Sequence, residues 1–519
     1  RHGCRPVVVE RHAGTAIHPR ARGLNVRTME IFRELGLERA IRAAGAAIAG
    51  NHLLLWVETL AGRELRRAPA GSLAERDEIA ARSPTGWASC AQDELEPVLL
   101  AAAREAGAEV RFSTELVALT QDEAGVTATL QSRVTGDRQR VRARYVVGAD
   151  GSRSPLRQAL GVTSEGPGLL TSNLGIYFRA QIDAARAGRD FILCFVDNPA
   201  VRGVLLAVDN AERWVFNAPF TTSAAVHADS FTPERCVALV RAALGLPELA
   251  VELLSVLPWD ASAGVARQFQ VGRVFFAGDA AHTMPPAGAF GLNTGVADAH
   301  NLAWKLAAVT SGTAGPGLLT SYESERRPVA VATVAHAVAA GRRRFAPVTP
   351  AGGDAGQSED VQVNDLTLML GAWYQSSAVL GGDEAFSLSA LARRGLALDG
   401  RPGTRAPHLW IERAGARTSS LDLLGRGWVL FASDAAWAVA GRALARARGL
   451  ALAVHSTGGA EADAWAAALG VGPHGATLVR PDGVVAWRAV DRVDEPGAAL
   501  ADVFAALLGD PAARSVAAE

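Results

Sequence analysis

Residues 274–306 read VFFAGDAAHTMPPAGAFGLNTGVADAHNLAWKL and combine an apolar run, a carboxylate and a loop in one short stretch. Val274 to Ala277 are apolar, as is typical of a buried strand, and Gly278 and Asp279 follow them directly. A carboxylate at the end of a strand can accept hydrogen bonds from hydroxyl groups, such as those of a ribose or a ribityl chain. The pattern therefore predicts a site for a hydroxyl-bearing ligand at Asp279.

The segment that follows predicts a rigid loop leading into a helix. Pro286 lacks a backbone donor, and Gly288 and Gly291 permit positive φ, so this segment is not expected to be regular helix. From Thr294 onward apolar residues recur at helical spacing, which predicts an amphipathic helix. Free N–H groups at a helix start favour an anion by roughly 0.3–1 kcal/mol. A reduced flavin is such an anion, and we expect residues 291–293 to offer backbone amides to its ring carbonyl.

This stretch closely resembles the Gly-Asp motif of the FAD-dependent aromatic hydroxylases, the class A flavoprotein monooxygenases typified by p-hydroxybenzoate hydroxylase. The resemblance implies that Asp279 binds the ribityl chain and that Leu292 and Asn293 hold the pyrimidine edge of the isoalloxazine ring. The residues of this motif that we expect to bind the cofactor are Gly278, Asp279, Pro286, Gly288, Gly291, Leu292 and Asn293.

Further expected FAD ligands lie near the start of the chain. Residues 6–9, followed by Glu10 and Arg11, are typical of the second strand of a Rossmann unit, whose terminal acid accepts the ribose hydroxyls of adenosine. We therefore expect Glu10 and Arg11 at the adenosine end of FAD. The resemblance implies that Arg22 lies beside the flavin and its pyrophosphate, helps to bind NADPH and is the candidate catalytic residue. It makes Arg20 a less critical neighbour.

Residues 145–157, which read YVVGADGSRSPLR, resemble the Asp-Gly fingerprint of the same family. The resemblance implies that Asp150 lies near the adenosine and the pyrophosphate. It also implies that Arg153 supports the binding of both FAD and the pyridine nucleotide. Gln92 opens a predicted helix and matches a glutamine that contacts the FAD phosphate and the ribityl region.

The elements that must position these residues predict an α/β fold. We expect a Rossmann-like FAD-binding domain, an antiparallel β-sheet substrate domain, and a C-terminal domain that resembles the thioredoxin-like domain of larger aromatic hydroxylases. Four short strands between residues 110 and 144 predict an antiparallel meander. The expected parts are 1–165 and 268–345 for FAD binding, 166–267 for the substrate sheet, 346–400 for a linker with a helical connection, and 401–519 for the cysteine-free thioredoxin-like domain.

The first methionine is Met29, and the chain opens directly before the strand at residues 6–9. The resemblance implies an upstream strand and a G-x-G-x-x-G turn that would cradle the FAD pyrophosphate, and the sequence contains neither. We therefore expect the native protein to carry roughly thirty more residues at its N-terminus, the usual length of this part of a βαβ unit.

Composition narrows the range of partners. The formal net charge is −1, so no global field recruits nucleic acid or an anionic membrane, and no apolar run is long enough to predict a membrane span. The four cysteines have no metal-ligand or C-x-x-C spacing, which fits a cytoplasmic protein without metal or disulfides. Nearly all basic residues are arginine, and Lys305 is the single lysine. We expect a monomer or a homodimer.

The resemblance also implies the reaction. NADPH or NADH reduces FAD, O2 adds to the reduced ring to give a C4a-hydroperoxide, and this species hydroxylates an aromatic small molecule. The chain looks most like actinobacterial aromatic polyketide hydroxylases, so a polycyclic polyketide is the expected substrate. Two alternatives remain open: a Baeyer–Villiger oxygenase or epoxidase, and a non-catalytic flavin-binding or ligand-binding protein. Candidate pocket walls, each of them more often plain sheet core, are Trp56, Phe178, Phe195, Trp214, Phe216 and Phe220.

Overall fold

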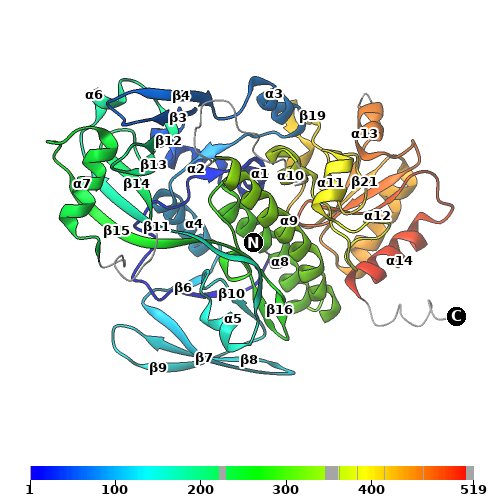
Figure 1. Cartoon of the computed structure of the whole chain (residues 1–519). Coiled ribbons are helices and arrows are strands. Elements are labelled where there is room, and N and C mark those ends of the chain that lie inside the picture. The colour runs from blue at the N-terminus through cyan, green and yellow to red at the C-terminus, as the bar shows by residue number, and fades with distance from the viewer. Residues whose placement is uncertain are drawn as a thin grey trace.

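Two long helices, α8 (Phe290–Thr310) and α9 (Ser321–Arg344), run through the middle of the computed structural model (Figure 1). An eight-stranded sheet lies on one side of them and a four-stranded sheet with its helices on the other. The structure describes residues 2–509 except 221–229, 345–360, 362, 383, 414 and 460. Among these residues no helix is long and apolar enough to cross a membrane, and no cluster of His, Cys, Asp or Glu could hold a metal ion.

Short parallel pairs of strands join distant parts of the chain near the expected FAD site. Strand β1 (Val7–Val9) pairs in parallel with β6 (Glu109–Arg111). Strand β10 (Val146–Gly148) pairs in parallel with β17 (Val274–Phe276), which also pairs with β16 (Gln270–Val271). Parallel strands present their carboxyl ends at one edge, and ligands of open α/β sheets bind there. These pairs therefore bring strand-end residues of separate segments toward one edge.

Several helices of this region begin at residues whose side chains favour a helix start. The side chain of Asn25 accepts a hydrogen bond from the Thr28 N–H and so caps α1. The two-stranded pair of β2 with β5 leads into α1 on one side and into α4 on the other. The bounds are β2 (Gly23–Leu24), α1 (Val26–Glu34), α2 (Glu38–Ala44), α3 (Leu73–Arg82), β5 (Ala88–Ser89), α4 (Gln92–Glu105) and α5 (Pro155–Ala159).

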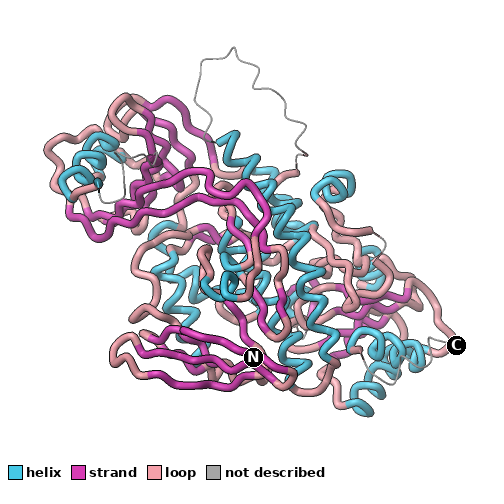
Figure 2. The backbone as a smooth tube through the Cα atoms, turned by 60° about the horizontal axis from the view of Figure 1, so that its bottom comes forward, coloured by secondary structure: helices cyan, strands magenta, loops and turns pink. Residues whose placement is uncertain are grey.

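The antiparallel meander has three strands instead of the four expected. Strands β7 (Thr114–Asp122), β8 (Gly125–Ser132) and β9 (Arg138–Ala143) form it, and Figure 2 shows it as a separate layer beside the N-terminus. The expected first strand is β6, which pairs with β1 instead. The prediction failed there because local alternation does not reveal whether a strand pairs with its neighbour or with a distant segment.

The eight-stranded sheet forms where the substrate sheet was expected, and β3 and β4 join it from much earlier in the chain. Its core contains Phe178, Trp214 and Phe216, each completely buried. The helix α7 (Pro233–Leu244) contributes Cys236 and Val240 to the same core. In order across the sheet the strands are β18 (His282–Thr283), β15 (Glu252–Ala266), β11 (Ser164–Arg179), β14 (Arg213–Phe220), β13 (Arg202–Ala207), β12 (Phe191–Asp197), β3 (Leu53–Val57) and β4 (Glu64–Pro69).

The C-terminal unit, as we call described residues 399–509, contains a four-stranded sheet in the order β22-β21-β23-β24. Strand β21 pairs in parallel with β22 and antiparallel with β23. The bounds are β19 (Trp410–Arg413), β20 (Ala416–Ser419), β21 (Trp428–Ala432), α12 (Ala435–Arg448), β22 (Leu452–Ser456), α13 (Ala462–Leu469), β23 (Ala476–Val479), β24 (Val485–Ala489) and α14 (Pro496–Leu508). Residues 346–360 and 362 of the expected linker lie outside the described residues, and α10 (Asp365–Gly371) and α11 (Leu388–Arg394) occupy much of its remainder.

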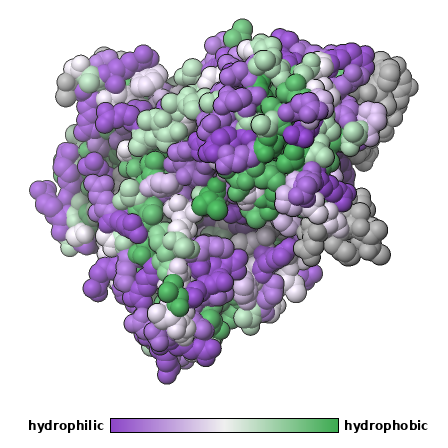
Figure 3. Space-filling view, turned by 90° about the vertical axis from the view of Figure 1, so that its left-hand side faces the viewer, coloured by the Kyte–Doolittle hydropathy of each residue, from purple (hydrophilic) through white to green (hydrophobic). Residues whose placement is uncertain are grey.

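A buried network of charges joins the C-terminal unit to α8 and α9. The Lys305 ammonium on α8 lies 2.7 Å from the Glu325 carboxylate on α9, and both side chains are completely buried. Arg480 of the C-terminal unit donates to the same carboxylate at 2.6 and 2.9 Å and is also completely buried. Such charges require partners because desolvation of an isolated ion costs several kcal/mol. The outer surface is different, since polar side chains cover most of the face shown in Figure 3.

Candidate functional site

A cavity of about 3200 Å³ lies between α8, the eight-stranded sheet and the N-terminal segment. Most of the expected site residues line it, although they come from five separate stretches of sequence. Those that line it are Glu10, Arg11, Arg22, Gln92, Arg153, Gly278, Asp279, Pro286, Gly288, Gly291 and Leu292. Asp150 and Asn293 are not among its lining residues.

The Gly278–Asp279 turn lies at the end of β17, as the sequence predicts. Gly278 has a φ of +58°, which a glycine adopts without steric cost. The Asp279 carboxyl is exposed to the cavity, and its pKa is raised by the loss of water around it, while His282 and Arg20 act in the opposite direction. The position suits a carboxylate that accepts hydroxyl groups from a bound ligand.

Helix α8 begins at Phe290, four residues before the predicted start at Thr294, and so corrects that prediction. Ala289 takes a left-handed conformation with a φ of +57°, and no side chain caps the helix. Gly288 also has positive φ, and a Cβ there would lie 2.2 Å from the Phe290 ring. Gly291 therefore lies in the first turn, where backbone N–H groups have no partner within the helix and can bind an anion.

The side chains of Asn293 and Asp150 form hydrogen bonds with other groups of the protein. The Asn293 amide accepts from the Asn25 N–H at 2.9 Å and donates to the Gly23 carbonyl at 2.9 Å, so it ties α8 to the β2–α1 turn. The Asp150 carboxylate accepts from the Ser154 hydroxyl at 2.6 Å and the Leu156 N–H at 3.0 Å at the start of α5. Both side chains thus have protein partners, and their expected contacts with FAD stay predictions.

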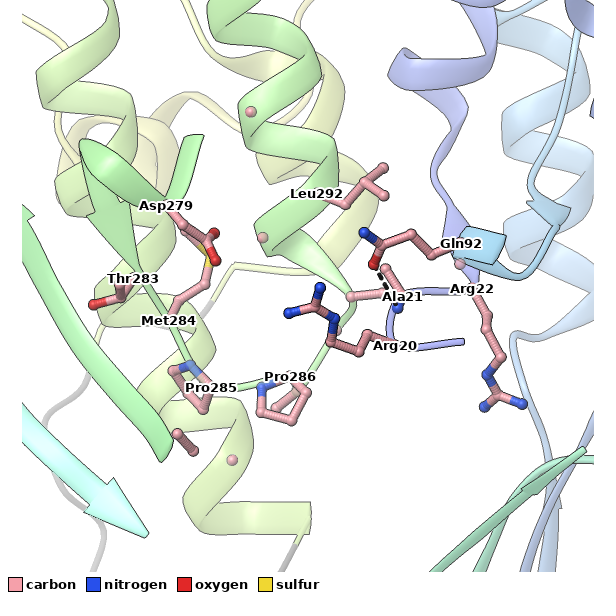
Figure 4. Close-up of a pocket in the computed structure, with 18 of the residues that line it drawn as sticks. Arg20, Ala21, Arg22, Gln92, Asp279, Thr283, Met284, Pro285, Pro286 and Leu292 are labelled. Carbon is pink, nitrogen blue, oxygen red and sulfur yellow. Dashed lines mark hydrogen bonds between the residues drawn. The ribbon is translucent and has the colours of Figure 1, made fainter. Parts of the chain in front are cut away.

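Arg20 and Arg22 point in opposite directions (Figure 4). Arg20 extends toward Pro286, and its guanidinium lies in the cavity. Arg22 extends away from α8 and donates to the carbonyls of Ala207 at 2.5 Å and Ile192 at 3.1 Å. Enclosure by protein lowers the pKa of Arg22 to about 10. The residue that reaches toward the Pro286 loop is thus Arg20, which the sequence placed second, while Arg22 connects the basic loop to the eight-stranded sheet.

The remaining expected ligands lie along the same cavity with few protein partners. Gln92 accepts a hydrogen bond from the Ala21 N–H at 3.4 Å, which holds the basic loop beside α4 (Figure 4). The Glu10 carboxylate accepts from the His12 N–H at 2.8 Å. Arg153 is mostly exposed and lies 3.4 Å from the Asp260 carboxylate. These side chains remain accessible to a ligand in the cavity.

The sheet side of the cavity contains aromatic rings among polar and apolar side chains. The Trp56 and Phe195 rings stack with their centroids 5.0 Å apart at an angle of 15°, and both residues line the cavity. Phe178, Trp214 and Phe216 belong to the sheet core, and Phe220 packs against Phe231. His18, for which no role was predicted, lines the cavity, and burial together with the smaller effect of the Arg20 charge lowers its pKa to about 4.

An elongated ligand with an anionic part and an aromatic part fits these groups. The uncapped start of α8 can bind the anionic edge, Asp279 can accept hydroxyl groups, and Glu10 lies at the end of a strand at which a ribose can bind. The stacked Trp56 and Phe195 rings line the cavity, with the Arg66 guanidinium 4.7 Å from the centroid of the Trp56 ring, and can contact a second, aromatic molecule. The donor set therefore fits FAD together with an aromatic substrate.

Comparison with known proteins gives the same answer for the whole chain. Residues 1–337 match the model of the FAD binding domain, and residues 399–511 match that of the aromatic-ring hydroxylase C-terminal region. A Streptomyces halstedii protein described as a polyketide hydroxylase is 48% identical over 95% of this chain and 90% of its own length. The tetracenomycin A2 monooxygenase-dioxygenase of Streptomyces glaucescens is 38% identical over 98% of this chain and 94% of that protein.

A solved structure agrees over the same extent. The ternary complex of aklavinone-11 hydroxylase with FAD and aklavinone superposes with a TM-score of 0.87 and is 36% identical. The match covers 98% of this chain and 95% of that one. The α/β arrangement around α8 is therefore shared by an enzyme that binds FAD. The chain belongs to the family of FAD-binding aromatic-ring hydroxylases, and it is an FAD-dependent monooxygenase.

Proposed function

We propose that this enzyme places one hydroxyl group on a polycyclic aromatic polyketide, with FAD as cofactor and NADPH or NADH as reductant. The reaction balances when the reduced nicotinamide and a proton convert one atom of O2 to water and the other atom enters the ring. The observation that carries the proposal is the stacked pair of Trp56 and Phe195 in the same cavity as the Gly278–Asp279 turn. Flat stacked rings favour a substrate of fused aromatic rings.

Different residues of the chain bind the cofactor, attract its charge and exclude water. When bound, the flavin accepts hydride, activates O2 and transfers oxygen. Asp279 holds the hydroxyl groups of the cofactor chain, and the first turn of α8 holds its anionic edge. Arg20, which extends into the cavity, attracts the negative charge of the phosphates or of the reduced cofactor. The sheet excludes water from the reacting atoms, since water there diverts reducing equivalents to peroxide.

The relatives support the choice of substrate class. Aklavinone and tetracenomycin are the names of the compounds that two of them act on or bind, according to their descriptions. The aromatic wall built from β3 and β12 combines the stacked rings with the Arg66 guanidinium, which lies 4.7 Å from the centroid of the Trp56 ring, and both kinds of group attract electron-rich aromatic rings. The position that is hydroxylated depends on how the substrate lies against this wall.

We also propose a thioredoxin-like fold for the C-terminal unit and retain the domain boundaries expected from the sequence. The four-stranded sheet with one parallel and two antiparallel pairings, flanked by α12, α13 and α14, supports this assignment. The unit contains none of the four cysteines of the chain, so it performs no thiol chemistry. Its contribution is structural.

The test follows oxidation of NADPH by the FAD-loaded enzyme under air, with and without a hydroxylated anthraquinone-type substrate. We expect substrate to accelerate oxidation and the product to gain the mass of one oxygen atom with its rings intact. Phe195→Ala should raise KM for the polycycle, because one ring of the stack is lost, and leave the slow oxidation without substrate unchanged. Phe220→Ala, which lies outside the cavity lining, is the matched control.

Two other results lead to different conclusions. A lactone of the same mass, or the hydroxy acid that is heavier by one water after hydrolysis of the lactone, indicates Baeyer–Villiger chemistry, and an epoxide indicates attack on an isolated double bond. Tight FAD binding without any acceleration by a series of polycyclic phenols contradicts the hydroxylase proposal and favours a non-catalytic flavin-binding protein. Separate runs with NADPH and NADH identify the reductant.

A further inference from the structure

Asp298 is a completely buried acid on α8, and its carboxylate accepts hydrogen bonds from three groups of different segments. Its Oδ2 accepts from the Gly278 N–H at 3.0 Å and from the His282 ring nitrogen Nε2 at 2.7 Å. Its Oδ1 accepts from the Arg326 Nε at 2.8 Å. A buried charge persists only when it is paired in this way. Asp298 therefore joins the turn at Gly278 to α9.

The contact with Gly278 depends on two glycines that face each other. A Cβ added to Gly295 would lie 3.2 Å from the Gly278 Cα, and one added to Gly278 would lie 3.8 Å from the Gly295 Cα. Larger residues would force α8 away from the turn. Asp298 is three residues after Gly295, so its side chain lies on the same side of the helix and reaches the Gly278 N–H.

From Asp298 the contacts continue to the C-terminal unit. The Arg326 guanidinium donates from Nη1 to the Tyr374 hydroxyl at 2.9 Å and from Nη2 to the Thr294 carbonyl at 3.3 Å. The Tyr374 N–H donates to the Gly403 carbonyl at 2.9 Å, and the Arg480 guanidinium lies 5.6 Å from the Tyr374 ring. An unbroken series of contacts thus connects the Gly278–Asp279 turn with the C-terminal unit, beside the pairing of Arg480 with Glu325.

The environment of Asp298 keeps it ionised. Burial alone would raise the pKa of its carboxyl, but His282 and Arg326 outweigh this and hold the pKa below the ordinary value. The ring nitrogen Nδ1 of His282 is buried and has no hydrogen-bond partner among the described residues, so the hydrogen bond of the ring is the one that Nε2 makes to Asp298. The carboxylate is consequently the fixed point about which the turn, the histidine and Arg326 are arranged.

We propose that Asp298 is a positioning residue that holds the Gly278–Asp279 turn in its flavin-binding shape, and that Tyr374 extends this support to the C-terminal unit. The proposal rests on the proposed role of Asp279 in binding FAD. It gives the C-terminal unit a function in cofactor binding although its charges do not touch the cofactor turn. Asp298 itself is completely buried and does not line the cavity.

The first test measures the dissociation constant of FAD with the flavin-free protein by fluorescence titration. Asp298→Asn should weaken binding about tenfold or more, since a hydrogen bond to a charged group is lost at the turn. Glu30→Gln is the matched control, because Glu30 is also buried and pairs with Arg405 of the C-terminal unit without touching the turn. We expect Glu30→Gln to lower Tm and leave the FAD dissociation constant within about twofold.

The second test needs no flavin. Hydrogen exchange of a peptide covering residues 274–283 should be faster in flavin-free Asp298→Asn, because the Gly278 N–H loses its charged acceptor, and unchanged in Glu30→Gln. Tyr374→Phe, which keeps the buried carboxylate, should raise the FAD dissociation constant by a factor of about two to five, as removal of one hydrogen bond predicts. It supplies the result if Asp298→Asn does not fold.

A double-mutant cycle decides whether the two residues act together. If Tyr374 acts through Asp298, the double variant binds FAD no more weakly than Asp298→Asn alone. Equal weakening by Asp298→Asn and Glu30→Gln, with no faster exchange at residues 274–283, overturns the proposal. If Asp279→Asn weakens FAD binding while Asp298→Asn and Tyr374→Phe do not, only this proposal falls. If Asp279→Asn has no effect, the proposed role of Asp279 falls, and the exchange result alone decides whether Asp298 holds the turn.

Discussion

Charged side chains meet different conditions in the cavity and at the interface of the C-terminal unit. At the interface Lys305, Glu325 and Arg480 are completely buried, and each has a protein partner within 3 Å. Arg20 and Asp279 line the cavity, and within the part of the chain that the structure describes neither side chain has a hydrogen bond to protein. Charges with protein partners hold the fold together, whereas accessible charges without them are available to a ligand.

The electrostatics of the two regions differ accordingly. Burial alone would raise the pKa of Glu325, but Arg480 and Lys305 outweigh it and hold the pKa far below the ordinary value. For Asp279 the loss of water prevails, and its pKa is raised. Basic side chains of the protein thus stabilise the carboxylate of Glu325 at the interface. The carboxylate of Asp279 in the cavity has no such protein partner among the described residues and can bind a ligand.

The largest effect that tests this difference is expected at the interface. Arg480→Met should lower the free energy of unfolding by about 3–5 kcal/mol, because it leaves the carboxylates of Glu325 and Asp482 buried with fewer partners. Chemical denaturation monitored by tryptophan fluorescence measures the change. Arg401→Met, which removes an exposed pair with Asp399, is the control and should cost less than about 1 kcal/mol. Equal costs would remove the distinction between the two kinds of pair.

A change of pH tests both regions together. His408 in the C-terminal unit and His18 at the cavity each have a pKa lowered from 6.5 to about 4, with burial as the main cause. The unfolded state then binds more protons than the native state between these values. The free energy of unfolding should therefore be highest above pH 6.5, where both histidines are neutral in both states. It should decrease as the pH falls toward 4, by at most about 3 kcal/mol for each histidine.

Substitution separates the two histidines. His408→Asn and His18→Asn should each make unfolding less dependent on pH between 6.5 and 4, which denaturation at several pH values detects. Only His18→Asn should also alter ligand binding, because only His18 lines the cavity. A pH dependence that neither substitution reduces would show that other groups dominate.

Asp279→Asn should have a smaller effect, and only on the ligand. The loss of a charged hydrogen-bond acceptor should weaken FAD binding by about 1.5–3 kcal/mol, roughly 10-fold to 150-fold. The Tm of the flavin-free protein should stay the same or rise slightly, because the carboxylate has no protein partner to lose and is itself poorly solvated. A clear fall in Tm without a change in FAD binding would place Asp279 with the structural charges.

Asp150→Ala should have the smallest effect, and only on stability. Asp150 accepts hydrogen bonds at the start of α5, so its removal should cost about 1 kcal/mol of unfolding free energy, as for a lost helix cap. We expect the FAD dissociation constant to be unchanged. Weaker FAD binding by this variant, comparable to that of Asp279→Asn, would support the role that the Asp-Gly fingerprint implies and would contradict the division between structural and ligand-binding charges.

The sequence predicts the local parts of this molecule better than the partners across it. The strand, the turn at Gly278 and the helix after it were all predictable, because each has a local signal. The early start of α8 was not, since it depends on the left-handed conformation of Ala289 and on the packing of Phe290. The partner of Asn293 lies at Asn25, far away in the chain, and no local pattern indicates it.

Helix α8 also shows why the buried charges were missed. Thr294, Asp298, Asn301 and Lys305 recur at helical spacing and look like a solvent-exposed polar face, yet all four are buried against α9 and the C-terminal unit. The apolar stripe that includes Val296, Ala299 and Ala303 faces the cavity instead. The periodicity was correct, but a pattern in one helix does not say which face meets water and which meets a charged partner.

The single lysine has a practical consequence. Lys305 is the single lysine of residues 1–519 and is completely buried, so amine-reactive reagents meet no accessible lysine side chain in this part of the folded protein. Modification at Lys305 requires the interface between α8 and the C-terminal unit to open. The rate of acylation at this one position therefore reports how often the two parts separate, without any label having to be engineered into the protein.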